Sequence, residues 1–339
     1  MITIVGGGIA GASLAWALAG RGRRDVTVYD ERPIGSGSTG KAFGGFRTQQ
    51  GSALNVALSL AARDVFEARA ERIRFLPVGY LYLAENEAAA AALAERAERQ
   101  RAWGLPIEHP DPLELAPFLV AGDVLATNYC ALDGTYAPAD VLGCLVEEAR
   151  ERGATFHYGR AADAAALDAD TVVVCAGIWA GPVGEALGVR LQVAPVERGI
   201  FDVGPFDWMP SGVPVVLDVG SGYHLRERDR HLLIIGPGDP HAWEHHRAWL
   251  AHRAPRAAVA EPCARWTGHY EVTFDHHPLA GPTERDGVWA MCGFSGHGVM
   301  HSPAVAESLA AMMLGETPPV DIVALDPRRT EPLHDDTQL

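Results

Sequence analysis

A glycine-rich turn at the start of the chain constrains its fold more than any other feature. Ile2–Val5 is an apolar run, and Gly6, Gly8 and Gly11 follow it in the spacing Gly-x-Gly-x-x-Gly. Gly6 permits a tight turn after a strand, Gly8 lets backbone approach a pyrophosphate, and Gly11 lets the next helix pack closely on the strand. The apolar residues of Ile9–Ala19 recur at helical spacing. The sequence therefore predicts a strand, a turn and a helix.

An acidic residue after the second strand completes a dinucleotide-binding pattern. The short apolar run Val26–Tyr29 ends at Asp30, 19 positions after Gly11. A carboxylate at this place can hold ribose hydroxyls, and Glu31 is a second candidate for that role. The N-terminus of the first helix offers N–H groups and a positive dipole end to phosphates. Taken alone, this pattern fits either FAD or NAD.

The charge balance limits the partners of the chain. Its formal net charge is −15 at pH 7. Nucleic acid and anionic membranes attract basic surfaces, so we expect neither as a partner. The five cysteines are scattered, without a Cys-x-x-Cys pair, which is typical of a reducing compartment. The first residues lack the basic start of a signal peptide. We therefore expect a cytoplasmic protein that acts on small molecules.

The order of the remaining segments predicts two domains. Helical patterns over Ala53–Arg69, Pro138–Arg152 and Ala304–Leu314 accompany short apolar strands near both ends of the chain. Residues 191–270 instead hold strand-like runs separated by Gly, Pro and Asp turns, with one helix around His241–His252. We expect an α/β fold: a Rossmann-type FAD-binding domain assembled from separated segments, with an inserted, mostly antiparallel β substrate domain. The first would take residues 1–76, 137–188 and 276–330, and the second residues 77–136 and 189–275.

Four further segments carry a resemblance to a known family. Gly35–Arg47 reads Gly-Ser-Gly-Ser-Thr-Gly-Lys-Ala-Phe-Gly-Gly-Phe-Arg and resembles the second flavin loop of the D-amino-acid oxidase superfamily. Val174–Ala180 resembles the segment in which the members of this superfamily return from a strand to a loop near the cofactor. Tyr270–Pro278 resembles the approach to the last flavin loop, and Gly293–Gly298 resembles that loop. The superfamily includes sarcosine oxidases, glycine oxidases, dimethylglycine dehydrogenases and a mitochondrial assembly factor. The resemblance spans the whole chain and implies FAD rather than NAD.

The resemblance also implies which residues contact the cofactor. The loop Gly293–Gly298 precedes a helix, whose positive dipole end would stabilise an anionic reduced flavin. The expected FAD-binding residues are Gly6, Gly8, Ile9, Ala10, Gly11, Asp30, Glu31, Ser38, Thr39, Gly44, Gly45, Ala161, Ala176, Gly177, Trp179, Gly293, Ser295, Gly296, His297 and Gly298.

We expect the FAD to be bound non-covalently. Gly268 stands where sarcosine oxidases have the cysteine that tethers their flavin. Dimethylglycine dehydrogenases use a histidine in the first flavin loop, and Ser36–Arg47 contains none. Cys292, close to the last flavin loop, is the residue that could still form such a bond.

Departures from the family shape the expected substrate pocket. Arg47 resembles the arginine of sarcosine-type enzymes, and a guanidinium can bind a carboxylate through two hydrogen bonds. Alternatively, Arg47 holds a loop or a flavin phosphate. Tyr270 takes the place of the carboxylate-binding arginine of glycine and D-amino-acid oxidases, and Met300 that of a sarcosine oxidase lysine. We expect these residues and His224 to line the pocket. With fewer cations there, the substrate need not be a simple small amino acid.

The implied activity is oxidation of an amine or amino acid. Hydride transfer from a carbon next to nitrogen to flavin N5 would give an imine, which water hydrolyses. The assembly-factor relative implies an alternative, a flavin-binding scaffold with little turnover.

Lys41 is the only lysine in the chain. Sarcosine-type oxidases activate oxygen with a lysine on a strand that corresponds to Leu232–Gly236, and this stretch is apolar. Reduction of oxygen develops negative charge that a positive group stabilises, so Lys41 is the one lysine candidate for that role. We expect slow reaction with oxygen and another electron carrier as the natural acceptor.

Two histidine patterns are interpreted as structural. His241–His245 reads His-Ala-Trp-Glu-His and matches the pattern of inverted zinc proteases. We assign it to a solvated helix face and expect no metal. His276 and His277 are adjacent, and in an extended segment they would point to opposite sides.

Overall fold

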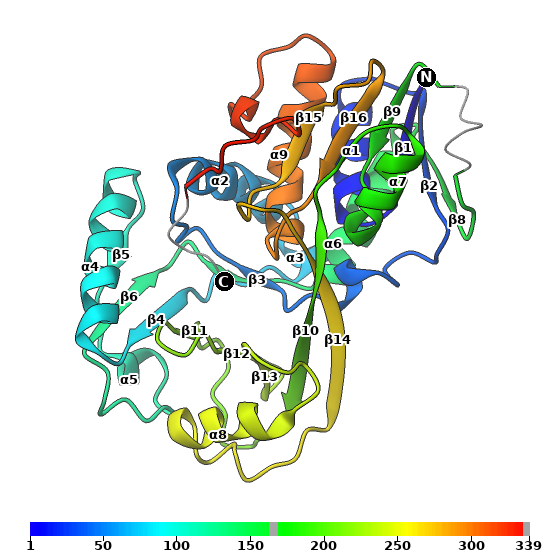
Figure 1. The fold of residues 1–339 in the computed structure, drawn as a ribbon. Coiled ribbons are helices and arrows are strands. Elements are labelled where there is room, and N and C mark those ends of the chain that lie inside the picture. The colour runs from blue at the N-terminus through cyan, green and yellow to red at the C-terminus, as the bar shows by residue number, and fades with distance from the viewer. Residues whose placement is uncertain (163–168, 335–339) are drawn as a thin grey trace.

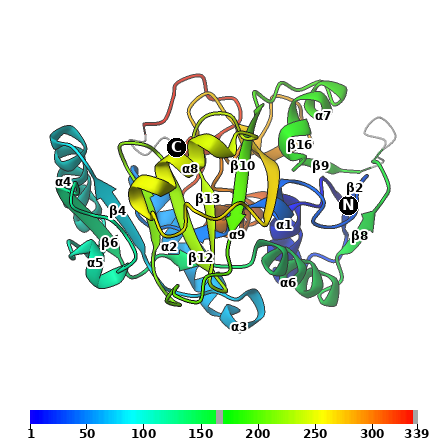
Figure 2. The ribbon, with the colours of Figure 1, turned by 90° about the horizontal axis from the view of Figure 1, so that it is seen from below.

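Two sheets organise the chain. The computed structural model describes residues 1–162 and 169–334. Figure 1 shows one sheet in the upper part and the other in the lower part, with two long strands between them, β10 (Ala194–Val203) and β14 (Ala264–Val272). Figure 2 gives the view from below, in which β10 lies between β13 and α1.

The first sheet contains the glycine-rich turn. Its six strands run in the order β15-β16-β9-β1-β2-β8, and each neighbouring pair is parallel except β15 with β16. Its strands are β1 (Ile2–Val5), β2 (Val26–Asp30), β8 (Thr155–Tyr158), β9 (Thr171–Val174), β15 (Leu279–Pro282) and β16 (Val288–Cys292). This is the parallel, β-α-β arrangement that the glycine pattern predicts.

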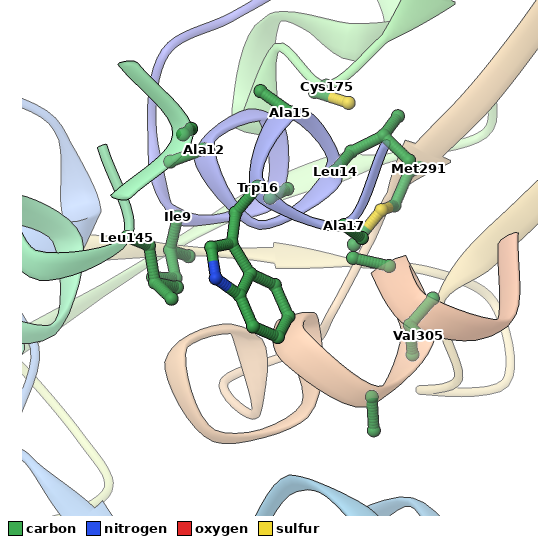
Figure 3. Close-up of a cluster of buried hydrophobic side chains, with 14 of the residues drawn as sticks. Ile9, Ala12, Leu14, Ala15, Trp16, Ala17, Leu145, Cys175, Met291 and Val305 are labelled. Carbon is green, nitrogen blue, oxygen red and sulfur yellow. The ribbon is translucent and has the colours of Figure 1, made fainter. Parts of the chain in front are cut away.

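Both faces of this sheet are buried, and the side chains of β1 alternate between them. Ile2 and Ile4 of β1 pack against the core that includes α1, whereas Val5 belongs to a separate core on the opposite face. Figure 3 shows the first core, in which side chains of other elements gather around α1. The helices of this core include α1 (Ile9–Gly20), α6 (Pro138–Glu151) and α9 (Gly298–Met313), and the opposite face is covered by α7 (Ala180–Ala186).

The second sheet has eight strands in the order β14-β10-β13-β12-β11-β4-β6-β5. All neighbouring pairs are antiparallel except β11 with β4. Its remaining strands are β4 (Tyr80–Ala84), β5 (Ile107–Glu108), β6 (Ala126–Cys130), β11 (Val215–Asp218), β12 (His224–Arg228) and β13 (His231–Ile235). The helix α8 (Trp243–Arg253) covers one face, where Trp249 and Leu250 pack on Phe201 and neighbouring strand residues.

A two-stranded ladder, four further helices and three 3₁₀ turns complete the described part of the chain. The two-stranded ladder of β3 (Gly45–Phe46) and β7 (Gly134–Thr135) lies next to the segment that carries Arg47. The other elements are α2 (Ala53–Glu67), α3 (Ala70–Ile73), α4 (Glu87–Ala102), α5 (Pro112–Leu115) and the 3₁₀ turns η1 (Ser38–Lys41), η2 (Gly177–Trp179) and η3 (Val323–Leu325). Because each sheet draws its strands from the segments expected for one domain, we propose that division of the chain into two domains. The α/β fold class is confirmed.

Three local expectations are wrong. The last long helix begins at Gly298 rather than Ala304 and continues through Pro303. Proline removes one helical hydrogen bond, and the burial of the surrounding turns compensates for that loss. The helix α8 begins at Trp243, so His241 lies outside it. His276 has φ +60° and therefore sits in a turn, not in an extended segment. Within residues 1–162 and 169–334, no helix is long and apolar enough to cross a membrane.

Candidate active site

A single large cavity collects most of the predicted site residues. Its volume is about 930 Å³, and it extends from the first turn of the parallel sheet to the inner face of the second sheet. The lining includes Gly6, Gly8, Ile9, Ala10, Asp30, Glu31, Ser38, Thr39, Lys41, Gly44, Gly45, Arg47, Ala161, Ala176, Gly177, Trp179, His224, Tyr270, Gly296, His297, Gly298 and Met300. Gly11, Gly293 and Ser295 lie behind this lining rather than in it.

Two glycines of the first turn stand where neighbouring backbone leaves no room for a side chain. A Cβ on Gly6, whose φ is +109°, would stand 2.3 Å from the carbonyl oxygen of Cys175. A Cβ on Gly11 would stand 1.9 Å from the carbonyl oxygen of Gly6. The absence of a Cβ at Gly6 and Gly11 therefore lets the first turn approach β9 and α1 closely, and Gly8 lines the cavity. Since Gly8 caps α1 without a side chain, the turn fits a pyrophosphate.

The second flavin loop packs directly against this turn. The amide of Ile9 donates a hydrogen bond of 3.1 Å to Thr39 Oγ1. Asp30, at the end of β2, accepts a 2.8 Å hydrogen bond from the amide of Gly7. Arg32 stacks 3.6 Å above the Trp179 ring. This end of the cavity therefore combines a glycine turn, an acidic residue and a stacked aromatic group, which fits the adenosine half of a dinucleotide.

Arg47 is buried at the other end of the cavity. Its Nη1 donates a 3.1 Å hydrogen bond to the Tyr82 hydroxyl, and its Nη2 lies 2.8 Å from His297 Nε2. A guanidinium has only donors, so Nε2 of His297 accepts and the imidazole is neutral, with its proton on Nδ1. The guanidinium thus has a fixed orientation between a strand of the second sheet and the last flavin loop.

Hydrogen bonds hold the backbone around Arg47 in place. Its carbonyl oxygen accepts hydrogen bonds from Gln50 Nε2, at 2.8 Å, and from Ser59 Oγ, at 3.0 Å. The buried carboxylate of Asp133 accepts from Thr48 and from Gln49 Nε2. Burial raises the pKa of Asp133 to about 6 despite these donors. These hydrogen bonds anchor the backbone around Arg47 to buried neighbouring residues.

The predicted pocket residues His224, Tyr270 and Met300 line the same cavity as Arg47 with neutral side chains. Burial, and next the charge of Arg47, lower the pKa of His224 to about 3, so this histidine is neutral at pH 7. Burial raises the pKa of Tyr270, and Arg198 lies 5.6 Å from the centre of its ring. Met300 is buried in the first turn of α9.

Lys41 occupies the edge of the cavity rather than its depth. Its side chain is exposed, and its carbonyl oxygen accepts a 3.0 Å hydrogen bond from Trp266 Nε1. Gly268 faces the Lys41 side chain, since a Cβ there would stand 3.3 Å from that of Lys41. Cys292 is fully buried in β16 and does not line the cavity, whereas the buried Cys175 does.

Several residues of the second sheet that line the cavity or hold its loops were not predicted from the sequence. Tyr80 and Tyr82 alternate in β4 and therefore share one face, a signal that was present in the run Tyr-Leu-Tyr-Leu. Arg226 donates to the carbonyl oxygen of Gly44 at 2.8 Å and fixes the flavin loop. Glu271, next to Tyr270 in β14, also lines the cavity. No local pattern distinguishes Arg226 or Glu271, because their importance comes from contacts distant in sequence.

Comparisons with known proteins agree on one family of flavoenzymes. Residues 1–312 match a family model described as FAD dependent oxidoreductase. The chain is 28% identical over 346 residues to a glycine oxidase of Geobacillus kaustophilus (strain HTA426), with 89% of each chain covered. It is 26% identical to the mitochondrial dimethylglycine dehydrogenase of Rattus norvegicus, covering 96% of this chain but only 44% of that protein.

A solved structure is similar over nearly the full length. The L-proline dehydrogenase from P. horikoshii superimposes with a TM-score of 0.89 at 25% identity, covering 97% of this chain and 96% of the other. A glycine oxidase structure from Geobacillus kaustophilus gives a TM-score of 0.83 at 24% identity, covering 97% of this chain and 98% of that one, which supports the fold.

Proposed function

This chain belongs to the family of FAD-dependent oxidoreductases, and we propose that it oxidises the carbon–nitrogen bond of an amine or amino acid that carries a carboxylate. The observation that supports this substrate class is the buried guanidinium of Arg47, which lines the cavity beside the last flavin loop. The names of the relatives agree with it, since glycine, dimethylglycine, sarcosine and L-proline are all amines with a carboxylate.

The cavity residues have separate tasks in this proposal. The turn from Gly6 to Ala10, Asp30 and the loop with Thr39 would hold the nucleotide end of FAD. When bound, FAD supplies a flavin that accepts a hydride at N5 from the carbon next to nitrogen, leaving an imine that water hydrolyses. Arg47 would bind the substrate carboxylate and thereby orient that carbon.

The neutral groups around Arg47 favour an uncharged amine. His224 and Tyr270 carry no charge near pH 7 because burial shifts the pKa of both away from neutrality. The positive guanidinium disfavours an ammonium group nearby. An amine that binds uncharged already has its lone pair, so the reaction requires no additional general base.

The second substrate in this proposal is an electron carrier other than oxygen. The strand β13 contributes buried apolar side chains from Leu232 to Ile235, of which Ile235 lines the cavity. A cation at that place would favour the reduction of oxygen. Lys41, the only lysine in the chain, lies at the exposed rim instead.

Anaerobic bleaching of the flavin tests the proposed reaction. Purified holoprotein is mixed without oxygen with glycine, sarcosine, dimethylglycine and L-proline, and with the corresponding amines that lack a carboxylate. The proposal expects loss of the flavin absorbance with at least one of the acids and weaker bleaching with its carboxylate-free partner. A flavin that no amine bleaches would instead favour the alternative of a flavin-binding scaffold.

A further inference from the structure

The carboxyl group of Glu271 stands between η2 and the last flavin loop, and Glu271 lines the cavity. Glu271 follows Tyr270 in β14, so its side chain projects from the opposite side of the strand. Its Oε1 accepts a 3.3 Å hydrogen bond from the amide of Phe294, and its carbonyl oxygen accepts one of 3.0 Å from the amide of Ser295. Glu271 is therefore tied to the last flavin loop through both its backbone and its side chain.

The other carboxyl oxygen of Glu271 lacks a partner. Oε2 is inaccessible to solvent, and within the described part of the chain no atom forms a hydrogen bond with it. A Cβ placed on Gly177 would stand 3.7 Å from this oxygen, so it lies beside the backbone of η2. Both Glu271 and Gly177 line the cavity. Buried polar atoms in native proteins almost always have a partner, and Glu271 and Gly177 both border the cavity in which a cofactor would bind.

The surroundings favour the neutral form of this group. Burial raises the pKa of Glu271 to about 7, although backbone amides of the last flavin loop act in the opposite direction. Glu271 interacts electrostatically with the thiols of Cys175 and Cys292, and burial raises the pKa of both, so they stay protonated. Arg329, the cation nearest to Cys292, is paired with Asp275 at 2.7 Å. Among the residues that the structure describes, no cation lowers the pKa of Glu271.

We propose that Glu271 is a cofactor-binding residue whose neutral carboxyl group donates a hydrogen bond from Oε2 to an acceptor atom of the bound flavin nucleotide. The acceptor is an oxygen or nitrogen of the flavin ring or of its ribityl chain. The proposal rests on FAD as the cofactor and not on the identity of the substrate. It gives Glu271 a role in FAD affinity that is separate from the role of Arg47 in substrate affinity.

Linkage fixes the direction of the pH dependence. A donor must keep its proton in the complex, so FAD binding raises the pKa of Glu271 further. Affinity for FAD is then greatest at pH values below the pKa of the apoprotein and falls as the pH rises through it, by up to tenfold per pH unit for one proton. A carboxylate that accepts a hydrogen bond from the flavin would give the opposite slope.

The experiment measures FAD binding to apoprotein in the absence of any amine. For wild type and Glu271→Gln, quenching of flavin fluorescence gives the Kd for FAD between about pH 6 and pH 9. This range covers the raised pKa that a buried carboxyl group can have. The matched control is Glu244→Gln, at an exposed position of α8. The amide keeps a donor but cannot titrate. We expect the wild-type and control Kd to rise with pH, and the Glu271→Gln Kd to stay flat apart from any slope that other groups contribute.

Two further readouts keep the outcome decisive. Glu271→Ala removes the donor and should weaken binding at low pH by about twofold to tenfold, the contribution of one hydrogen bond. The absorbance spectrum of the holoprotein should shift with pH in wild type but not in Glu271→Gln. A wild-type Kd that is independent of pH, or that falls as pH rises, overturns the proposal even if the variants fail to fold. If the Kd of Glu271→Gln for FAD depends on pH as strongly as that of wild type, the proposal is also overturned. Because no amine is present, these results are independent of whether the proposed oxidation is correct.

Discussion

Replacing Arg47 by methionine should selectively remove recognition of a substrate carboxylate. Methionine retains much of the buried apolar volume of the side chain but carries no charge and no donor. The guanidinium that it replaces is fixed by Tyr82 and by His297. The variant therefore loses both the charge that attracts a carboxylate and the orientation in which it is presented.

The expected loss follows from the burial of the guanidinium. Arg47 is only 3% exposed, so water screens its interaction with a bound anion weakly. A charge-assisted contact of this kind contributes about 2–4 kcal/mol. At 1.4 kcal/mol per factor of ten, kcat/KM for a carboxylate substrate should fall by roughly 30-fold to 700-fold. Arg47→Lys should recover part of this loss, because an ammonium keeps the charge but not the paired donors.

The assay compares each acid with the corresponding amine that lacks a carboxylate. Steady-state kinetics with an artificial electron acceptor gives kcat/KM, and fluorescence titration gives the Kd for FAD. Arg247→Met, at an exposed position of α8, serves as the matched control. The reasoning is refuted if Arg47→Met reduces kcat/KM equally for both kinds of substrate. An equal loss together with weaker FAD binding would mean that Arg47 supports the loop or the cofactor.

Four other outcomes are expected. Gly6→Ala should release FAD and destabilise the fold by more than about 2 kcal/mol, because its Cβ would stand 2.3 Å from the Cys175 carbonyl oxygen; FAD content and thermal unfolding check this. Burial opposes the charge of Glu148, but donors led by Arg69 lower its pKa from 4.5 to about 2. The ionised Glu148 therefore contributes stability that is present above pH 4.5 and is lost as pH falls through 2. Glu148→Gln should flatten the acid limb of a pH–stability curve and cost about 1–3 kcal/mol at pH 7. Acid precipitation should leave the yellow flavin in the supernatant, and flavin in the pellet would contradict non-covalent binding. Photoreduced protein should react slowly with oxygen in stopped-flow mixing; fast reoxidation that survives Lys41→Met would contradict the proposed acceptor.

The arrangement of the cofactor end could be predicted because its causes are local. Gly6 and Gly11 are required by contacts within a single strand–turn–helix unit, and such contacts follow from spacing alone. Parallel strands bring the loops at their carboxyl ends to one edge of a sheet, so loops far apart in sequence meet there by topology. The resemblance to the family predicted cofactor contacts for Thr39 and Gly177, and this topology explains why both line the cavity.

Only the tertiary structure decided how the substrate end is arranged. Arg47 contacts Tyr82 and His297, which lie 35 and 250 positions away, and no periodic pattern connects them. The start of α9 before Pro303 depends on the burial of its first turns, which outweighs the local signal of proline. The raised pKa of Glu271 likewise comes from desolvation by elements distant in sequence. Burial and charge pairing depend on the full set of neighbours in space, so a sequence can name these side chains but cannot assign their protonation states or partners.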